Sequence, residues 1–379
     1  MQTFRLLVLG AGFSKSAGLP LAVDLFRELR QRVRLLYGTD NHLERDLGYY
    51  VSFLRSTEGF SGCADDVDVE RFLSFLDVEH YLGLKGSDTW STEGNLTQLL
   101  IRHTLGYILL DHMPDKVPEL YRHFASKLTT SDWILTFNYD TLLEQALDSI
   151  GTPYRLFPNR YSEVGTHTAT VDSSRDEVVV LKLHGSVDWF DKTTYQERLR
   201  QAMEYPIPYR VKHPVFGPDR IVVSEPIVDG PRFVDDPLLQ LYRVKAPASV
   251  YAKSYWECPP FLLSPSLSKL LYVKPLAEFW YGLGRSGGLN LGFGVIGYSL
   301  PIYDDYACLA IYKIARNYQG YEPDLQLDGR AKRPVRILDY RPTDEAREDL
   351  QAKYQFLDSR RTEYWYDGLS DDGIEWFMA

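Results

Sequence analysis

A glycine-containing turn directly behind a short apolar run constrains the fold of this chain more than any other feature. Phe4–Leu9 has the length and apolar character of a buried parallel strand. Gly10 and Gly12 follow and permit a tight turn in which backbone N–H groups approach a ligand. We expect a helix to begin near Leu19, with Pro20 in its first turn. Such a helix N-terminus favours a diphosphate, although a plain strand–turn–helix without a ligand is the alternative.

The dinucleotide-binding pattern G-x-G-x-x-G is incomplete in this turn. Its third glycine would occupy the position of Lys15. The pattern also requires an acidic residue at the end of a second strand about twenty residues later. That stretch instead carries a helical stripe with Leu25, Leu29 and Val33. A dehydrogenase is therefore disfavoured.

A second apolar run, 133–136, is followed by two polar residues with possible binding roles. Asn138 and Asp140 come directly before a helical stripe that starts at Leu142. They therefore fall at the carboxyl end of a strand, which is where open α/β sheets bind ligands. The alternative is that both side chains only cap the helix, and this alternative is weaker for Asn138 than for Asp140.

A third apolar run, 178–183, is rich in β-branched residues and ends at His184. The imidazole would face the same crevice as Gly12 and Asn138. With an ordinary pKa of about 6.5, a histidine can move a proton at neutral pH. A lone histidine is more often structural, but its place at a strand end beside Gly185 favours a catalytic role.

Two further strands are expected near the end of the chain. The run 289–296 leads into a turn with Gly297 and Ser299, and a helix is expected over 306–318. The run 334–338 indicates a last strand, after which Asp339 can accept hydrogen bonds from a ribose.

These patterns predict an α/β fold with a Rossmann-like parallel sheet, helices on both faces and a helical insertion. We expect a binding domain over 1–345, with the helical insertion at about 40–130 and a mixed insertion at about 190–285. The mixed insertion is expected to hold a short strand at 220–223 and a helix near 276–283. A C-terminal helix and aromatic tail would follow over 346–379, and the tail aromatics either dock a partner or pack on the parent domain.

The net charge and the cysteine content exclude several classes of protein. The formal net charge of −10 argues against broad nucleic-acid binding. The three cysteines, Cys63, Cys258 and Cys308, are widely spaced and predict neither a zinc module nor a disulfide framework. No apolar run approaches the roughly eighteen residues of a membrane span, and no signal peptide is expected. A reduced, cytoplasmic protein without a metal fits best.

Four motifs together resemble a known superfamily. G-A-G-F-S (10–14), T-F-N-Y-D (136–140), L-H-G-S (183–186) and G-Y-S-L (297–300) occur in the order and context of the sirtuin-like superfamily. They are most similar to its bacterial NAD-hydrolysing branch, which belongs to anti-phage defence systems. Each motif alone is weak, but four in order at strand ends are specific.

The resemblance implies a role for each motif residue. Asn138 would position the nicotinamide ribose and a water molecule, and His184 would be the acid/base. Asp140 would hold the carboxamide, and Gly297 and Ser299 would contact the adenosine half. The first motif would hold the NAD+ diphosphate through Gly10, Ala11, Gly12, Phe13 and Ser14.

Departures from the deacetylase pattern favour water as the nucleophile. Deacetylase sirtuins carry four zinc-binding cysteines, and this chain has three scattered ones. They have Pro-Asp-Phe-Arg where this chain continues with Leu21, Ala22 and Val23, and a glutamine where Phe137 stands. The expected reaction is hydrolysis of NAD+ to nicotinamide and ADP-ribose through an oxocarbenium-like transition state. A non-catalytic NAD+ or ADP-ribose sensor, a scaffold subunit and a protein deacylase remain alternatives.

The resemblance also implies a toxic effector of abortive infection that is restrained until needed. A homo-oligomer is expected, and a partner such as a HerA-type ATPase or a short argonaute is possible. The isolated chain should then be weakly active or silent. We expect the insertion at 40–130, the aromatic tail at 364–377, or both, to build the controlling interface.

Overall fold

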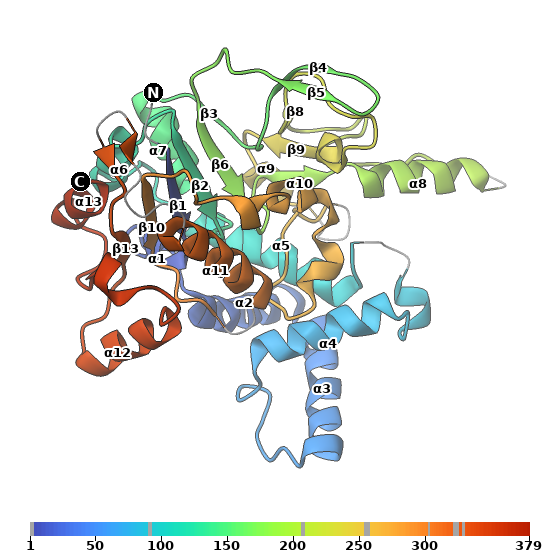
Figure 1. The fold of residues 1–379 in the computed structure, drawn as a ribbon. Helices are drawn as coiled ribbons and strands as arrows, with labels where there is room; N and C mark the ends of the chain where they lie inside the picture. The colour runs from blue at the N-terminus through green and yellow to red at the C-terminus, as the bar shows by residue number, and fades with distance from the viewer. Residues whose placement is uncertain are drawn as a thin grey trace.

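The computed structural model describes residues 4–89, 93–205, 209–253, 258–301, 304–320, 326–327 and 330–379 (Figure 1). Its centre is a sheet in which every strand pairing is parallel, as the sequence predicts. The seven strands of this sheet are β1 (Arg5–Leu9), β2 (Asp132–Thr136), β3 (Tyr154–Arg155), β6 (Val178–Lys182), β10 (Gly292–Ile296), β13 (Val335–Leu338) and β14 (Thr362–Trp365).

The strand order places a topological switch beside β1. The order across the sheet is β14-β13-β10-β1-β2-β6-β3, so the earlier strands β2, β3 and β6 lie on one side of β1 and the later strands β10, β13 and β14 lie on the other. Leu9 lies beside Ile296 on one side and beside Thr136 on the other, so these strands end level with one another. Polar residues that follow these strands therefore gather at one edge, the position at which such sheets bind ligands.

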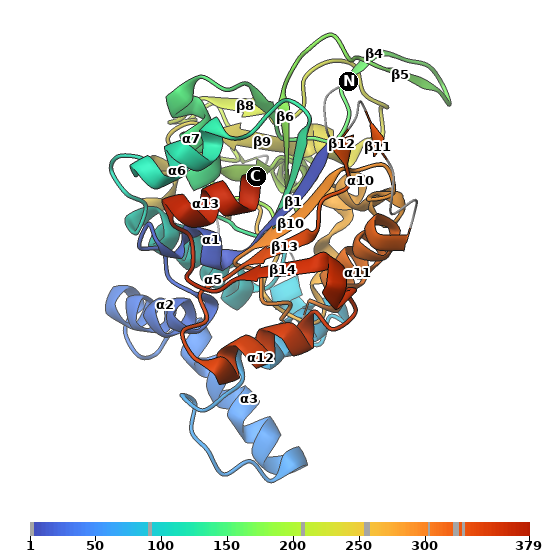
Figure 2. The same ribbon diagram turned by 60° about the vertical axis from the view of Figure 1, so that its left-hand side comes forward.

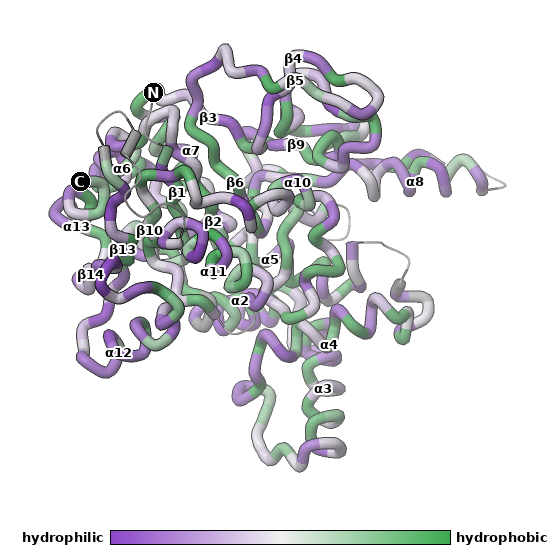
Figure 3. The backbone as a smooth tube through the Cα atoms, viewed as in Figure 1, coloured by the Kyte–Doolittle hydropathy of each residue, from purple (hydrophilic) through white to green (hydrophobic). Residues whose placement is uncertain are grey.

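Helices cover both faces of the sheet. In Figure 2, α6 (Glu119–Ser126), α7 (Leu142–Ile150) and α13 (Asp371–Met378) lie on one side, and α10 (Ala277–Trp280) and α11 (Asp305–Gly320) lie on the other. Hydrophobic residues follow the strands between these layers (Figure 3), and every residue of β6 is buried. The α/β class and the two helical layers agree with the expectation from the sequence. None of the helices in the described ranges is long and apolar enough to span a membrane.

The turn behind β1 differs from the prediction. A one-turn helix, α1 (Ala11–Lys15), begins directly after Gly10, and the long helix α2 (Ala22–Tyr37) starts after Leu21 and not near Leu19. Gly18 ends the first helix because its φ of +95° lies in the left-handed region. Pro20 favours an extended residue before it, so the second helix is delayed.

The segment between α2 and β2 is helical, as its apolar stripes predict. It contains α3 (His42–Glu58), α4 (Val69–Tyr81), α5 (Leu96–Asp111) and α6. Asn41, Asp68 and Asn95 each cap the following helix with a side-chain oxygen. Helix α3 projects from the body of the molecule, whereas α5 packs against α2 (Figure 1).

The region 190–285 holds a second, antiparallel sheet. Its strands are β7 (Trp189–Asp191), β9 (Leu241–Val244) and β8 (Ser224–Pro226), in that order, and α8 (Thr193–Glu204) follows β7. The strand predicted at 220–223 is wrong, because pairing with β9 starts only at Ser224. The helix predicted near 276–283 is reduced to α10 with short 3-10 turns on each side, since Gly282 adopts a φ of +79°.

Smaller hairpins and C-terminal elements complete the chain. The hairpins are β4 (Tyr161–Val164) with β5 (Ala169–Val171), and β11 (Gln326–Leu327) with β12 (Arg330–Ala331). After β13 come α12 (Asp344–Lys353), β14 and α13. A four-residue helix, α9 (Ala248–Tyr251), packs against α5.

The aromatic tail packs on its own sheet. Tyr364 and Trp365 belong to β14, which pairs in parallel with β13 and completes the sheet at one edge. Phe377 in α13 lies directly over Gly294, where a Cβ atom would stand 2.4 Å from its ring. The Trp365 and Trp376 rings lie 5.8 Å apart. Of the two expectations for these aromatics, the structure therefore shows packing on the parent domain.

Candidate functional site

A cavity of about 730 Å³ opens at the carboxyl ends of the strands beside the switch point. Its walls come from the turn after β1, the ends of β2, β6, β10 and β13, and the helical segment before β2. Most of the predicted site residues, from separate parts of the chain, line this cavity. They are Ala11, Gly12, Ser14, Asn138, Asp140, His184, Gly297, Ser299 and Asp339.

Two predicted residues, Gly10 and Phe13, do not line the cavity. The Phe13 ring is buried in the core, 5.2 Å from the Tyr121 ring and 5.1 Å from the Phe124 ring. The Tyr121 hydroxyl donates to the Phe13 carbonyl at 2.8 Å and so holds α1 against α6. Phe13 therefore anchors the turn from behind, because its apolar ring is stabilised by burial.

The glycines of the turn after β1 allow its backbone to pack closely against the backbone of the turn after β10. A Cβ atom on Gly10 would meet the Gly297 carbonyl oxygen at 2.5 Å, and one on Gly12 would meet Gly297 Cα at 2.7 Å. Gly297 itself has a φ of +61°, which favours glycine. The N–H groups of Gly10 and Gly12 donate to the carbonyls of Ile296 and Gly297, each at 2.9 Å. Backbone hydrogen bonds already use these two N–H groups, so a ligand approached by backbone N–H groups of this turn would have to meet others.

Asn138 ties the end of β2 to the turn after β1. Its Nδ2 donates to the Gly10 carbonyl at 3.0 Å and to Ser14 Oγ at 3.1 Å. Because a backbone carbonyl only accepts hydrogen bonds, this contact determines the orientation of the amide. The side-chain oxygen Oδ1 is left without a hydrogen bond within the described part of the chain. Asn138 thus offers one fixed acceptor to a ligand in the cavity.

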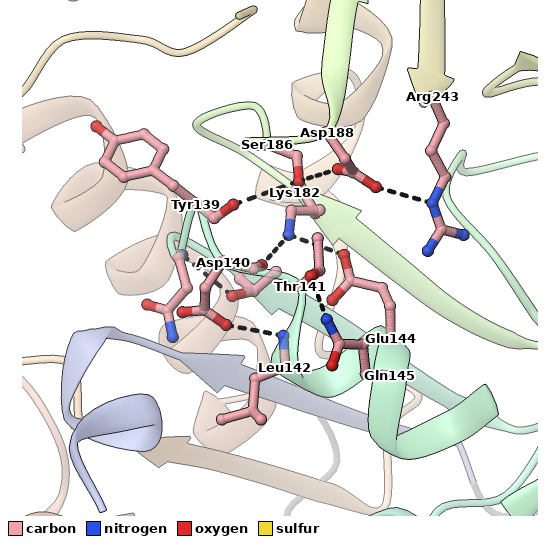
Figure 4. A network of polar contacts seen from close by, with 12 residues as sticks. Tyr139, Asp140, Thr141, Leu142, Glu144, Gln145, Lys182, Ser186, Asp188 and Arg243 are labelled. Atoms are coloured by element: carbon pink, nitrogen blue, oxygen red, sulfur yellow. Dashed lines mark hydrogen bonds and ion pairs between the residues drawn. The ribbon is translucent and has the colours of Figure 1, made fainter. Parts of the chain in front are cut away.

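Asp140 caps helix α7, which was one of the two roles considered for it from the sequence. Its Oδ1 accepts from the Leu142 N–H at 3.0 Å, at the start of α7. Its backbone carbonyl accepts from Lys182, whose ammonium also lies 2.8 Å from Glu144 (Figure 4). Lys182 and Glu144 are almost fully buried. Asp140 therefore caps the helix and still lines the cavity, while a buried ion pair holds its backbone from below.

The same polar network continues away from the cavity. Ser186 donates to the Tyr139 carbonyl and to Asp188, and Asp188 pairs with Arg243 at 2.8 Å (Figure 4). Arg243 lies on β9, so these contacts join the antiparallel sheet to the turn that follows β6. The network fixes both turns that carry the predicted catalytic residues, since each buried polar group has a partner.

His184 is buried in the wall of the cavity and hydrogen-bonds to Tyr306. Its Nε2 contacts the Tyr306 hydroxyl, and its ring lies 5.0 Å from the Phe137 ring. The other ring nitrogen, Nδ1, makes no hydrogen bond within the described ranges. Burial lowers the pKa of His184 to about 3, although the charge of Asp304 opposes the shift. The imidazole is therefore neutral at pH 7 and resists taking up a second proton, so one ring nitrogen donates a hydrogen bond and the other accepts one.

A buried ion pair that the sequence did not reveal lies beside His184. Lys269 contacts the Asp304 carboxylate, which also accepts from the Tyr298 hydroxyl at 2.9 Å. Burial alone would raise the pKa of Asp304, but His184 and Lys269 favour the carboxylate and hold that pKa below its usual range. Lys269 follows no periodic pattern in the sequence, and Asp304 lies just before the helix expected over 306–318.

The far end of the cavity is lined by Ser299, Asp339 and Arg341. Asp339 follows β13, as predicted, and its Oδ2 accepts from Arg341 at 3.0 Å. Its Oδ1 accepts from the Tyr340 N–H at 2.8 Å. A ribose at this end would therefore meet a carboxylate already held by an arginine. Arg341 lies just beyond the last predicted strand, and only its position after Asp339 could have indicated it.

Metal-binding clusters were not expected, and the described residues contain no group of three or more histidine, cysteine or acidic side chains arranged to hold a metal. Cys63 is exposed, Cys258 is buried and Cys308 is half-buried.

Comparisons with known proteins concern the segment that carries the predicted catalytic residues. Residues 132–214 match the family model described as the SIR2-like domain. This chain is similar to the SIR2-like domain of the sirtuin superfamily. The matched segment contains Asn138, Asp140 and His184, together with β2, β6 and the turns that follow them.

Two solved structures show more distant likenesses. The first is the structure entitled "Structure of Sir2Tm bound to a propionylated peptide", which is 11% identical in sequence with a TM-score of 0.30. The alignment covers 99% of the present chain and 92% of the Sir2Tm chain. "The Structural basis of Sirtuin Substrate Affinity" is 12% identical, with 99% and 93% coverage and a TM-score of 0.33. Likenesses this distant carry no weight for function. No curated protein matches the chain.

Proposed function

We propose that this chain is an NAD+ glycohydrolase that converts NAD+ and water to nicotinamide and ADP-ribose. The observation that carries the proposal is the meeting of Asn138 and His184 at one cavity, beside the strand switch, within a segment similar to the SIR2-like domain. The cavity volume lies within the range of about 300–1,000 Å³ typical of ligand pockets. The SIR2-like segment supports NAD-dependent chemistry, and the choice of water as nucleophile is our own inference.

The chemistry assigns different tasks to the two residues. In hydrolysis, the bond between C1′ of the ribose and the nicotinamide nitrogen breaks, and C1′ gains oxocarbenium character. Asn138 Oδ1 can accept a hydrogen bond from a ribose hydroxyl or from the attacking water, because the Nδ2 contacts hold it in place. His184 is neutral, so when its Nε2–H donates to the Tyr306 hydroxyl, its Nδ1 can accept a hydrogen bond from a ribose hydroxyl and orient it.

A defence role and its control belong to the same proposal. Depletion of NAD+ would harm the cell that makes the enzyme, so activity should be restrained by a homo-oligomer or by a partner protein. This part rests on the resemblance of the four motifs. It predicts that purified chain alone hydrolyses NAD+ slowly and that a partner or trigger increases the rate.

The test compares wild type with Asn138→Ala and His184→Ala. We expect each variant to bind NAD+ but to lose turnover by roughly 10²-fold or more, because each removes a group that positions the ribose or the water. Chromatography of nicotinamide and ADP-ribose measures turnover by the purified protein. If the purified enzyme is restrained, NAD+ levels in cells that express each variant measure turnover instead. His112→Ala is the matched control, because His112 pairs with Glu28 away from the cavity.

Two results would contradict the proposal in different ways. Folded variants that turn over NAD+ at the wild-type rate would remove the roles of Asn138 and His184. Binding of NAD+ by the wild type, with no turnover in the tube or in cells, would show a sensor instead of an enzyme.

A further inference from the structure

Glu70, on the first turn of α4, brings a carboxyl group from the helical segment into the cavity. It lines the same cavity as Asn138 and His184. Its Oε2 is buried and has no hydrogen-bond partner. A buried polar atom without a partner is unfavourable, so it points to a group that completes the site when bound.

The other acidic residues of the cavity are engaged elsewhere or exposed. Asp304 pairs with Lys269, Asp140 caps α7, and Asp339 pairs with Arg341. Asp367 is exposed to solvent. Glu70 differs from these residues because its Oε2 is buried without a hydrogen-bond partner among the described residues.

We propose that Glu70 is the general base that activates the attacking water, an inference that rests on the proposed NAD+ hydrolysis. The water oxygen forms a bond to C1′ while the bond from C1′ to the nicotinamide nitrogen breaks. Nicotinamide leaves with that bonding pair, and the water proton passes to the Glu70 carboxylate. Glu70 then releases the proton to solvent, so NAD+ and water give nicotinamide, ADP-ribose and one proton.

The surroundings of Glu70 suit a base that works near neutral pH. Burial raises the pKa of Glu70 to about 7, with Lys269 opposing the shift and Asp304 and Asp68 adding to it. Tyr139 also faces Glu70, and the charge of Glu70 contributes to its raised pKa. A base whose pKa is close to the working pH is the most effective. Lys269 and Asp304 adjoin His184, so Glu70 lies at the His184 end of the cavity.

The experiment measures kcat, KM and NAD+ affinity for wild type and Glu70→Gln between pH 5 and 9. Glutamine keeps the size of the side chain but cannot take the proton. We expect kcat to fall about 100-fold or more, with NAD+ affinity by calorimetry within a few fold of wild type. In the wild type, kcat should decrease below about pH 7, and Glu70→Gln should lose this acid limb.

Asp68→Asn is the matched control. It removes a negative charge from the same helix end, and asparagine can still cap α4 through the contact that Asp68 makes with the Arg71 N–H. Its kcat should equal that of the wild type on the alkaline plateau, and its acid limb should move to lower pH, because Asp68 contributes to the raised pKa of Glu70. Unchanged kcat and pH profile in Glu70→Gln would overturn the role of Glu70 alone. A wild-type kcat that is flat down to pH 5 would also overturn it, even if Glu70→Gln failed to fold. Absence of any NAD+ hydrolysis by the wild type, both as purified protein and in expressing cells, would overturn both proposals.

Discussion

Lys182→Met tests whether the buried ion pair below Asp140 supports the site. The Lys182 side chain has 0% exposure and Glu144 has 2%, and their charged atoms lie 2.8 Å apart. The same ammonium donates to the Asp140 carbonyl. Methionine keeps the length and apolar character of the stem but removes three donors.

The expected loss of stability follows from what remains unpaired. Breaking a buried pair by removing one partner costs about 3–5 kcal/mol, because the remaining charge has no compensation. Glu144 can lower this cost by taking up a proton. Burial already raises its pKa above 4.5, and Lys182 opposes that shift in the wild type.

The pH dependence of Lys182→Met then has a definite sign. Without Lys182, the pKa of Glu144 in the folded state rises further, so the folded state binds more protons than the unfolded state. The contribution of Glu144 to the free energy of unfolding should therefore be fully present below about pH 4.5 and should be lost as the pH rises through the folded-state pKa. Urea denaturation at a series of pH values measures this slope.

The double variant Lys182→Met/Glu144→Leu is the control. Replacing both partners by apolar groups is often neutral or stabilising, so the double variant should recover most of the loss. The recovery separates the buried charge from the lost contact to Asp140, which both variants share. A loss below about 1 kcal/mol in Lys182→Met, or an equal loss in the double variant, would refute the reasoning.

Two further predictions concern the turn and the metal. Gly297→Ala should lower the free energy of unfolding by about 2–4 kcal/mol, because its Cβ would lie 2.4 Å from the Phe13 nitrogen at a φ of +61°. It should also weaken NAD+ binding. Calorimetric melting measures the loss of stability, and a variant as stable as the wild type would contradict the prediction. The rate of NAD+ hydrolysis should be unchanged after zinc is chelated, and metal analysis of the purified protein should accompany the rate measurement. Stoichiometric zinc that is lost together with activity would show that a metal site exists.

The local sequence was sufficient to predict the strands and the residues that follow them. A short apolar run followed by glycine or a polar residue depends on a few adjacent positions. Parallel strands present their carboxyl ends at one edge, so Asn138, His184 and Asp339 could be expected to meet there. Most of the predicted residues line one cavity in the structure.

Other features depended on contacts between distant segments. Whether the N–H groups of Gly10 and Gly12 are free depends on the backbone of Gly297, which lies close enough to accept one of them. Tyr306 stands 122 positions from its partner His184. Glu70 comes from the helical segment before β2. No periodicity records such pairings, because they arise only when separate elements pack.

The aromatic tail likewise combines a property that the sequence determined with one that only the tertiary structure decided. The sequence determined that Tyr364, Trp365 and Phe377 carry apolar area that must be covered, but it could not determine what covers them. The tertiary structure decided this, because β13 leaves an edge with unpaired backbone groups that β14 satisfies. Gly294 leaves space on the sheet that the Phe377 ring fills. The physical reason is that burial depends on a partner surface, and a partner surface exists only after the chain has folded.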